Sequence, residues 1–283
     1  GRSGTPIASW FMNESDLLVV WGASFSNHTG IADYKPIIQV DYDPMALGRF
    51  HGVDLPVLGH VGVTAELMAA ALPEDREPVD CVAEVEERRK IWAEEKRSRA
   101  MDDRGRGVNS AAIFESLSAA IDDDAVIAVD VGNNTYSFGR YFETRNHSVL
   151  MSGYLGSIGF GLPAAMGAWA AVGGKRQVVA VAWDGGFGQY AMEFTTAVRY
   201  DMNITLILLD NDEFGKISKE QRGVEYDVWQ TGLTNPDFAE FARSCGGYGV
   251  TVRESAELDG AIGDALGHQG PAIVAVITDP LLV

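Results

Sequence analysis

The sequence predicts an α/β protein built on a doubly wound parallel sheet, and one stretch of the chain carries most of that prediction. Residues 178–183 and 204–209 are short uncharged runs rich in Val, Ile and Leu, which is typical of strands buried on both faces of a parallel sheet. Residues 192–200, between them, place apolar side chains at helical spacing. A strand, a glycine turn, a helix and a second strand make a right-handed βαβ unit.

Each of these two strands runs into side chains that suit a metal ion. The first is followed by Asp184, Gly185 and Gly186, and the second by Asp210 and Asn211. Ligands of open α/β sheets bind outside the carboxyl ends of the strands, so these side chains are expected on one crevice. Carboxylate and amide oxygens suit Mg²⁺, and glycines leave backbone N–H groups open to a phosphate. An ordinary crossover turn with polar strand ends is the alternative interpretation.

Composition restricts the class of protein. The chain has 283 residues, 46% of them apolar, which is enough for one large or two modest domains. A net charge of −18 disfavours non-specific binding to nucleic acid or to anionic membranes. Two cysteines make no disulfide framework, and no secretory signal is recognised, so a cytoplasmic protein is expected. The uncharged stretch 146–174 is rich in Gly and predicts a loop and a buried helix, and no membrane span.

Three segments follow one another along the chain. Residues 1–72 predict part of a Rossmann-like domain, with strands at 16–21 and 36–40 and a helix at 63–72. Residues 73–107 are highly charged with spaced apolar positions, which predicts an amphipathic linker helix. Residues 108–283 predict a second α/β domain, with helices at 109–121, 238–244 and 256–266 and further strands at 125–131, 250–252 and 272–277.

The two polar strand ends resemble the motif of thiamine-diphosphate-dependent enzymes, G-D-G followed after about two dozen residues by N-N. The resemblance implies that Asp184, the Asn211 side chain and the backbone carbonyl of Glu213 hold Mg²⁺ against a diphosphate. Two positions depart from the motif: Trp183 stands where its first Gly is expected, and Asp210 where its first Asn is expected. The additional carboxylate either strengthens the metal site or repels the diphosphate.

The N-terminal segment resembles the second half of the central domain in the pyruvate oxidase and acetolactate synthase family. The matching pieces are Gly4-Thr5-Pro6, DLLVVWGASFS at 16–26, IIQVDYDP at 37–44 and DLPVLG at 54–59. That domain binds FAD in several members, and Asp41 is the candidate for a ribose hydroxyl. A turn residue before Pro44 is an equally good interpretation of Asp41. Together with the motif above, the resemblance covers essentially the whole chain.

Further cofactor contacts are implied by the same resemblance. Asn133 and Asn134 take positions that contact the phosphates, although alone they are typical of a solvated turn. Residues 156–165 are similar to the family segment G-x-M/I-G-x-G-x-P. There the carbonyl of Gly156 accepts a hydrogen bond from the aminopyrimidine, and Ile158 wedges between the two rings and bends the cofactor. An isolated Ile at that position would otherwise be typical of plain core.

Residues 214–222, FGKISKEQR, are similar to the run G-x-I-x-x-E-Q that pyruvate oxidases often carry. The resemblance implies that Phe214 and Gly215 contact the cofactor and that Ile217 and Glu220 face the substrate. Acetolactate synthases tend to carry Trp in place of Glu220, so this residue favours the oxidase. A surface helix with charges spaced i, i+4 is an equally good interpretation.

The resemblance therefore implies a thiamine-diphosphate- and Mg²⁺-dependent enzyme that decarboxylates pyruvate or a similar 2-oxo acid, with FAD as a further cofactor in the oxidase form. An acetolactate synthase-like carboligase and a non-catalytic homologue are the alternatives. No segment here resembles the pyrimidine-binding domain whose Glu activates the cofactor in the family. That domain is expected from the same gene or another subunit, in a homodimer or homotetramer, and this chain alone is expected to be inactive.

Overall fold

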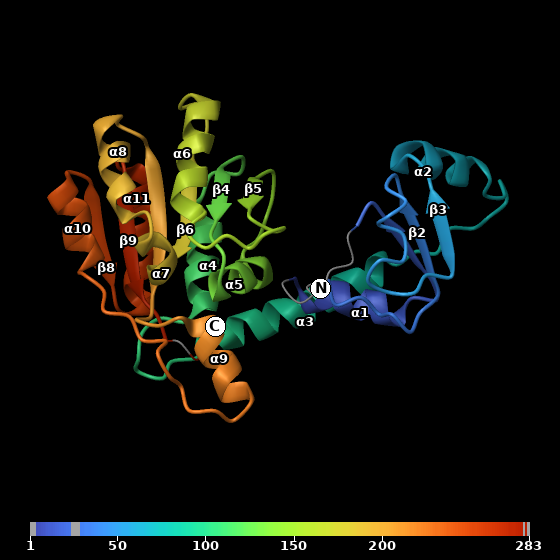
Figure 1. Ribbon diagram of the computed structural model, residues 1–283, viewed down its shortest axis with the longest axis horizontal. Helices are drawn as coiled ribbons and strands as arrows, with labels where there is room; N and C mark the ends of the chain where they lie inside the picture. The colour runs from blue at the N-terminus through green and yellow to red at the C-terminus, as the bar shows by residue number, and fades with distance from the viewer. Residues whose placement is uncertain (1–3, 24–28, 280, 282–283) are drawn as a thin grey trace. The chain divides into compact units, whose positions relative to one another are not determined.

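The structure, a computed structural model, describes residues 4–23, 29–279 and 281 and divides the chain into two compact units, Gly1–Glu95 and Lys96–Val283 (Figure 1). Each unit contains one sheet whose described strands are all parallel, with helices packed beside it. The predicted α/β class is confirmed. Positions 24–26 of the segment DLLVVWGASFS lie outside the described residues.

The first unit holds a three-stranded sheet in the order β1-β2-β3. The predicted strands and helix are present as β1, β2 and α2, and two further elements, α1 and β3, were not predicted. Strand β3 contains Pro56, which lacks a backbone N–H, so the local sequence disfavours a strand there. It pairs only with β2, at the edge of the sheet, where a missing donor is tolerated. The elements are α1 (Pro6–Glu14), β1 (Leu18–Trp21), β2 (Ile37–Asp41), β3 (Leu55–Leu58) and α2 (Val61–Ala70).

The predicted linker helix is shorter than expected. Helix α3 occupies Val82–Ala100, and residues 73–81 form no helix or strand. Pro73 and Pro78 explain the late start, because proline removes a backbone donor and clashes with the preceding turn inside a helix. Trp92 is the buried residue of α3, so the helix has one buried position and no continuous apolar face. The boundary between the two units falls inside this helix.

The second unit holds a six-stranded sheet in the order β5-β4-β6-β7-β9-β8. The chain passes from β4 outward to β5 and then returns to β6 on the other side of β4, so the strand order reverses between β4 and β6. Its elements are α4 (Ser110–Ala120), β4 (Val126–Val129), α5 (Asn133–Tyr141), β5 (Ser148–Met151), α6 (Gly161–Val172), β6 (Val178–Trp183), α7 (Asp184–Gly188), η1 (Ala191–Glu193), α8 (Phe194–Arg199), β7 (Ile204–Asp210), α9 (Gly215–Gly223), α10 (Phe238–Cys245), β8 (Tyr248–Val252), η2 (Ser255–Glu257), α11 (Leu258–Gly267) and β9 (Ala272–Ile277).

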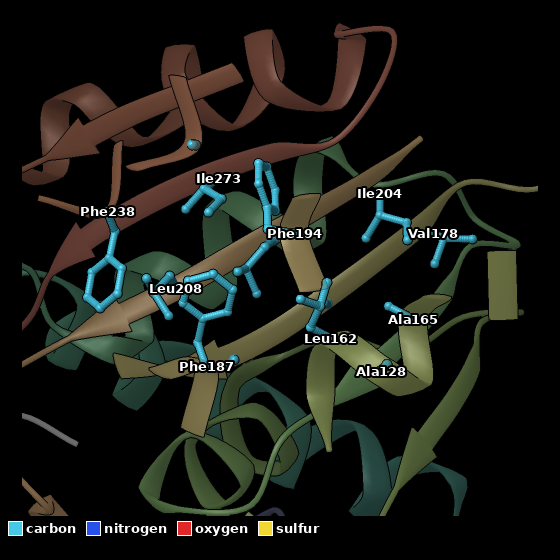
Figure 2. Close-up of a cluster of buried hydrophobic side chains, with 14 of the residues drawn as sticks. Ala128, Leu162, Ala165, Val178, Phe187, Phe194, Ile204, Leu208, Phe238 and Ile273 are labelled. Carbon is cyan, nitrogen blue, oxygen red and sulfur yellow. The ribbon is translucent and has the colours of Figure 1, made fainter. Parts of the chain in front are cut away.

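The predicted two-faced burial of the central strands is confirmed. In β6, Val178, Ala180 and Ala182 join a core with helices α6, α8 and α10, and Val179 and Val181 are buried on the opposite face. Figure 2 shows this core, in which Leu208 of β7 lies beside Phe187 of α7, between Phe238 of α10 and Phe194 of α8. Helix α4 packs against α5 and α11, and these two helices contact strands of the sheet. The central strands of the sheet are thus covered by helices on both faces, and their carboxyl ends lie together at one edge of the sheet.

Local structure after β6 differs from the expectation in two ways. The predicted glycine turn at 184–186 is the first turn of the short helix α7, and the predicted helix at 192–200 is divided into the 3₁₀ turn η1 and helix α8. Helix α5 and strand β5 were not predicted at all. Among the described residues, no helix is long and apolar enough to cross a membrane.

Candidate functional site

Two acidic residues lie side by side where β6 and β7 end. Trp183 pairs with Leu209 in the parallel ladder, so Asp184 and Asp210 follow at the same level of adjacent strands. The exposed fractions of Asp184 and Asp210 are 1% and 7%. Both side chains are therefore buried at the carboxyl edge of the sheet, Asp184 more deeply than Asp210.

Asp212 completes a cluster of three carboxylates. One oxygen from each of Asp184, Asp210 and Asp212 lies within 4.8 Å of the others. The Asn235 Nδ2 donates to all three, at 2.7, 2.8 and 3.1 Å respectively. An amide nitrogen carries only two hydrogens, so three acceptors share two donors. Three carboxylates that share one neutral donor group form an all-oxygen site with excess negative charge. Such a site fits a divalent cation such as Mg²⁺.

Burial dominates the electrostatics of this cluster. It raises the pKa of Asp184 to about 7, and the neighbouring Asp210 adds to the increase, whereas N–H donors from Asn235 and Gly185 oppose it. Burial also raises the pKa of Asp210. Charged carboxylates are costly in such a place unless they are paired or coordinate a metal. A bound cation would therefore favour the ionised forms.

Asn211 and Glu213 are close to the cluster but are engaged in local bonds. The Asn211 N–H donates to Asp184 Oδ2 at 3.3 Å, and its side-chain Oδ1 accepts from the Glu213 N–H at 3.2 Å. The Glu213 carbonyl accepts from the Gly215 N–H at 2.8 Å. The Glu213 carboxylate points elsewhere, to Arg222 at 3.2 Å. Both proposed oxygen ligands thus lie in one turn after β7, beside Asp184.

A cavity lies beside the carboxyl ends of β4, β6 and β7. Most of the predicted cofactor contacts line it, and Ile217 lines it as well. Asp184, Gly185, Gly186 and Glu220 are not among its lining residues. The lining consists of Val131, Gly132, Asn133, Asn134, Gly156, Ile158, Trp183, Leu209, Asn211, Phe214, Gly215, Lys216, Ile217 and Thr278.

The polar groups of this cavity include an unused donor. Asn133 and Asn134 open helix α5 and are not a solvated turn. The buried Nδ2 of Asn133 and the buried Oδ1 of Asn134 have no hydrogen-bond partner among the described residues. The Nδ2 of Asn133 lies next to Gly215, since a Cβ built on that glycine would be 3.0 Å from it. An unpaired donor beside apolar walls fits a ring-bearing ligand with phosphate oxygens.

Glu220 lies outside this cavity. Its side chain is 61% exposed on helix α9 and forms an i, i+4 ion pair with Lys216, which lowers the pKa of Glu220. Glu220 and Ile217 together line a shallow surface depression at the end of that helix. Only Ile217, 47% exposed, belongs to both places. The structure therefore matches the surface-helix interpretation of Glu220.

Comparison with known proteins agrees with the site. The family model described as "Thiamine pyrophosphate enzyme, C-terminal TPP binding domain" matches residues 130–276, more than half of the chain. The chain belongs to the thiamine pyrophosphate enzymes. The model described as "Thiamine pyrophosphate enzyme, central domain" matches residues 1–68. The predicted resemblance is confirmed.

Three curated relatives extend this result. The putative thiamine pyrophosphate-containing protein YdaP of Bacillus subtilis is 32% identical over 98% of this chain and 48% of its own length. A probable acetolactate synthase large subunit of Methanococcus aeolicus is 28% identical, over 99% and 50%. The acetolactate synthase isozyme 3 large subunit of Escherichia coli is 27% identical, over 94% and 48%. The chain spans about half the length of these relatives.

Asp130 is a residue of this thiamine pyrophosphate enzyme that the sequence analysis missed. It follows β4, is 1% exposed, and its Oδ1 accepts from the backbone N–H groups of Val131, Gly159 and Phe160 at 2.7, 2.8 and 3.0 Å. These bonds tie the segment that carries Ile158 to the strand end. Burial outweighs them and raises the pKa of Asp130 to about 6. An acidic residue at a predicted strand end was the available signal.

Two other residues had weaker signals or none. Asn235 lies in the connection between α9 and α10, where no periodic pattern or motif marks it. Lys216 lines the cavity although its charge suggested a solvated helix face.

In the first unit, Asp41 ends β2 and its Oδ1 accepts from the Asp43 N–H at 2.9 Å. That bond is typical of the turn interpretation of Asp41.

Proposed function

We propose that residues 108–283 bind thiamine diphosphate with Mg²⁺ at the carboxyl ends of β4, β6 and β7, and that the complete protein decarboxylates a 2-oxo acid such as pyruvate. One observation carries the proposal. The oxygen cluster around Asp184 and the apolar cavity beneath Ile158 lie at the same sheet edge, next to the strand-order reversal. Membership of the thiamine pyrophosphate enzymes supports the identity of the cofactor.

The residues divide into two groups in this proposal. Asp184, the Asn211 amide oxygen and the Glu213 carbonyl hold the cation, and the buried Asp210 adds negative charge beside them. Asn133, Asn134, Gly156, Ile158, Phe214 and Gly215 hold the cofactor, with apolar walls that exclude water. Gly185 and Gly186 adjoin its phosphates. When bound, thiamine diphosphate supplies the nucleophile and the electron sink for decarboxylation.

Two outcomes of the reaction have separate support. The run at 214–222 resembles pyruvate oxidases, and this favours oxidation with Ile217 and Glu220 near the substrate. The relatives named acetolactate synthase favour carboligation, and the exposed position of Glu220 removes weight from the oxidase. FAD at Asp41 rests on the resemblance alone, because that carboxylate already accepts from Asp43.

The proposed assembly includes a pyrimidine-binding domain that this chain does not resemble. The relatives are about twice as long as the matched region, which supports a domain supplied by the same gene or by another subunit. Homodimeric or homotetrameric assembly would bring such a domain to the cavity. We expect no turnover from residues 1–283 alone.

The test is a binding titration. Thiamine diphosphate is titrated into the chain with and without Mg²⁺ and followed by calorimetry. We expect Mg²⁺ to increase affinity, and Asp184→Asn to abolish that increase because a deeply placed oxygen ligand loses its charge. Asp264→Asn, on the exposed face of α11, removes the same charge and should leave the Mg²⁺ effect intact. Equal affinity of the unaltered chain in both conditions would contradict the proposal.

A further inference from the structure

Trp183 occupies an unusual place at the end of β6. Its side chain extends across the sheet edge, where the indole Nε1 donates to the Val131 carbonyl after β4 at 2.7 Å. The ring also packs edge-on against Phe214, with centroids 5.2 Å apart and planes at 72°. One hydrogen bond and one aromatic contact thus hold the indole across the gap between β4 and the turn that precedes α9.

The indole covers three glycines at once. A Cβ built on Gly132 would lie 3.1 Å from a ring atom of Trp183, and one on Gly186 would lie 2.8 Å away. A Cβ on Gly185 would overlap the ring directly. The indole therefore lies directly against the backbone of the two glycines that follow Asp184, and against Gly132 at the end of β4.

The lining of the cavity shows the consequence. Trp183 and Asn211 belong to the lining, whereas Asp184, Gly185 and Gly186 lie beyond it. The indole and Asn211 consequently form the side of the cavity that is next to Asp184. A ligand that fills the cavity and also reaches Asp184 has to pass this ring.

We propose that Trp183 is a specificity-determining residue that narrows the Asp184 end of the cavity, so that the diphosphate end of the cofactor binds less tightly than it would without the indole. The inference rests on the proposed binding of thiamine diphosphate and states which part of the ligand meets resistance. Binding of the diphosphate requires loss of the indole bond to Val131 and of the contact with Phe214. The loss of this hydrogen bond together with the aromatic contact corresponds to about tenfold in an equilibrium constant.

The test compares two ligands on four proteins. Thiamine and thiamine diphosphate are titrated, with Mg²⁺, into the full chain and into Trp183→Gly, Trp183→Phe and Trp229→Gly. We expect Trp183→Gly to bind the diphosphate about tenfold more tightly than the unaltered chain does, with thiamine affinity unchanged. Trp183→Phe keeps an aromatic ring but lacks the donor, and should give a severalfold gain. Trp229, 71% exposed, is the matched control and should give none.

The outcomes separate this inference from the proposed function. One outcome is that the unaltered chain binds the diphosphate in an Mg²⁺-dependent way while Trp183→Gly leaves the ratio of diphosphate affinity to thiamine affinity unchanged. In that case the inference is wrong and the proposed function stands. If Trp183→Gly gives the gain but Mg²⁺ has no effect in any protein, the inference stands and the metal-dependent function does not. Should Trp183→Gly lose thiamine binding through misfolding, Trp183→Phe decides, and an unchanged ratio of the two affinities overturns the inference.

Discussion

The two parallel sheets of this chain are built from similar strands and differ in what covers them. Strand β2 of the first unit, IIQVD, and strand β6 of the second, VVAVAW, are both short and apolar. In the first unit β1 and β3 have no buried residue, and α2 has none either. In the second unit all residues of β7 are buried. Strand composition alone therefore does not produce a core, because burial requires helices packed on both faces of the sheet.

The same difference separates the acidic strand ends. Asp41 ends β2 in a half-buried turn and bonds to its own loop. Asp184 follows β6 almost fully buried, and its pKa is raised to about 7 by that burial. An aspartate at the carboxyl end of a strand becomes a cation ligand candidate only when the surrounding layers remove it from water.

The largest expected effect tests the difference between the two cores. Phe194→Ala removes a fully buried ring in the core of the second unit and should lower its free energy of unfolding by about 3–5 kcal/mol. Leu67→Ala on α2, where Leu67 is 67% exposed, should change stability by no more than about 0.5 kcal/mol. Hydrogen exchange of the β6 and β2 amides reports each unit separately. If both substitutions lowered the free energy of unfolding by similar amounts, Leu67 would have to be buried in solution, and the contrast between the two units would be wrong.

The next effect concerns Asp130, whose pKa is raised from 3.8 to about 6 by burial. A raised carboxyl pKa means that the native state holds the proton more tightly, so this stabilisation is full below about pH 4 and is lost as pH rises through 6. Relative to Asp130→Asn, the unaltered protein should lose about 2–3 kcal/mol of unfolding free energy between pH 4 and 7. Urea denaturation across this range measures it, and parallel curves for the two proteins would refute the assignment.

The smallest expected effect comes from comparing the carboxylate cluster after β6 and β7 with Asp41 at the end of β2. Asn235→Ala removes the shared donor of three carboxylates and should lower the free energy of unfolding by about 1–3 kcal/mol. Added Mg²⁺ should restore part of this loss, because a cation stabilises the carboxylates that have lost their amide donor. Asp41→Asn keeps its turn acceptor and should change the melting temperature little, with or without Mg²⁺. A loss in Asn235→Ala that Mg²⁺ leaves unchanged would argue against a cation at the cluster.

Sequence reasoning located five of the six strands that form the sheet of the second unit. The strands β6, β7 and β9 were predicted within one residue at either end, because short apolar runs rich in β-branched residues and bounded by polar residues or glycine are typical of buried strands. Elements α5 and β5 escaped prediction. Helix α5 contains Asn133 and Asn134 in its first turn, residues that favour turns when judged locally. Tertiary packing against α4 and β4 overrides that preference.

The amino-acid sequence by itself determined the parallel α/β architecture, the alignment of Asp184 with the end of β7, and the membership of the thiamine pyrophosphate enzymes. Periodicity and strand-end chemistry are local properties, and the matching motif is linear. Only the tertiary structure decided that Trp183 covers the glycines, that Asn235 joins the carboxylates, that Asp130 holds the Ile158 segment and that Glu220 faces solvent. Each of these depends on the direction of a side chain and on partners up to dozens of residues away, and burial sets both.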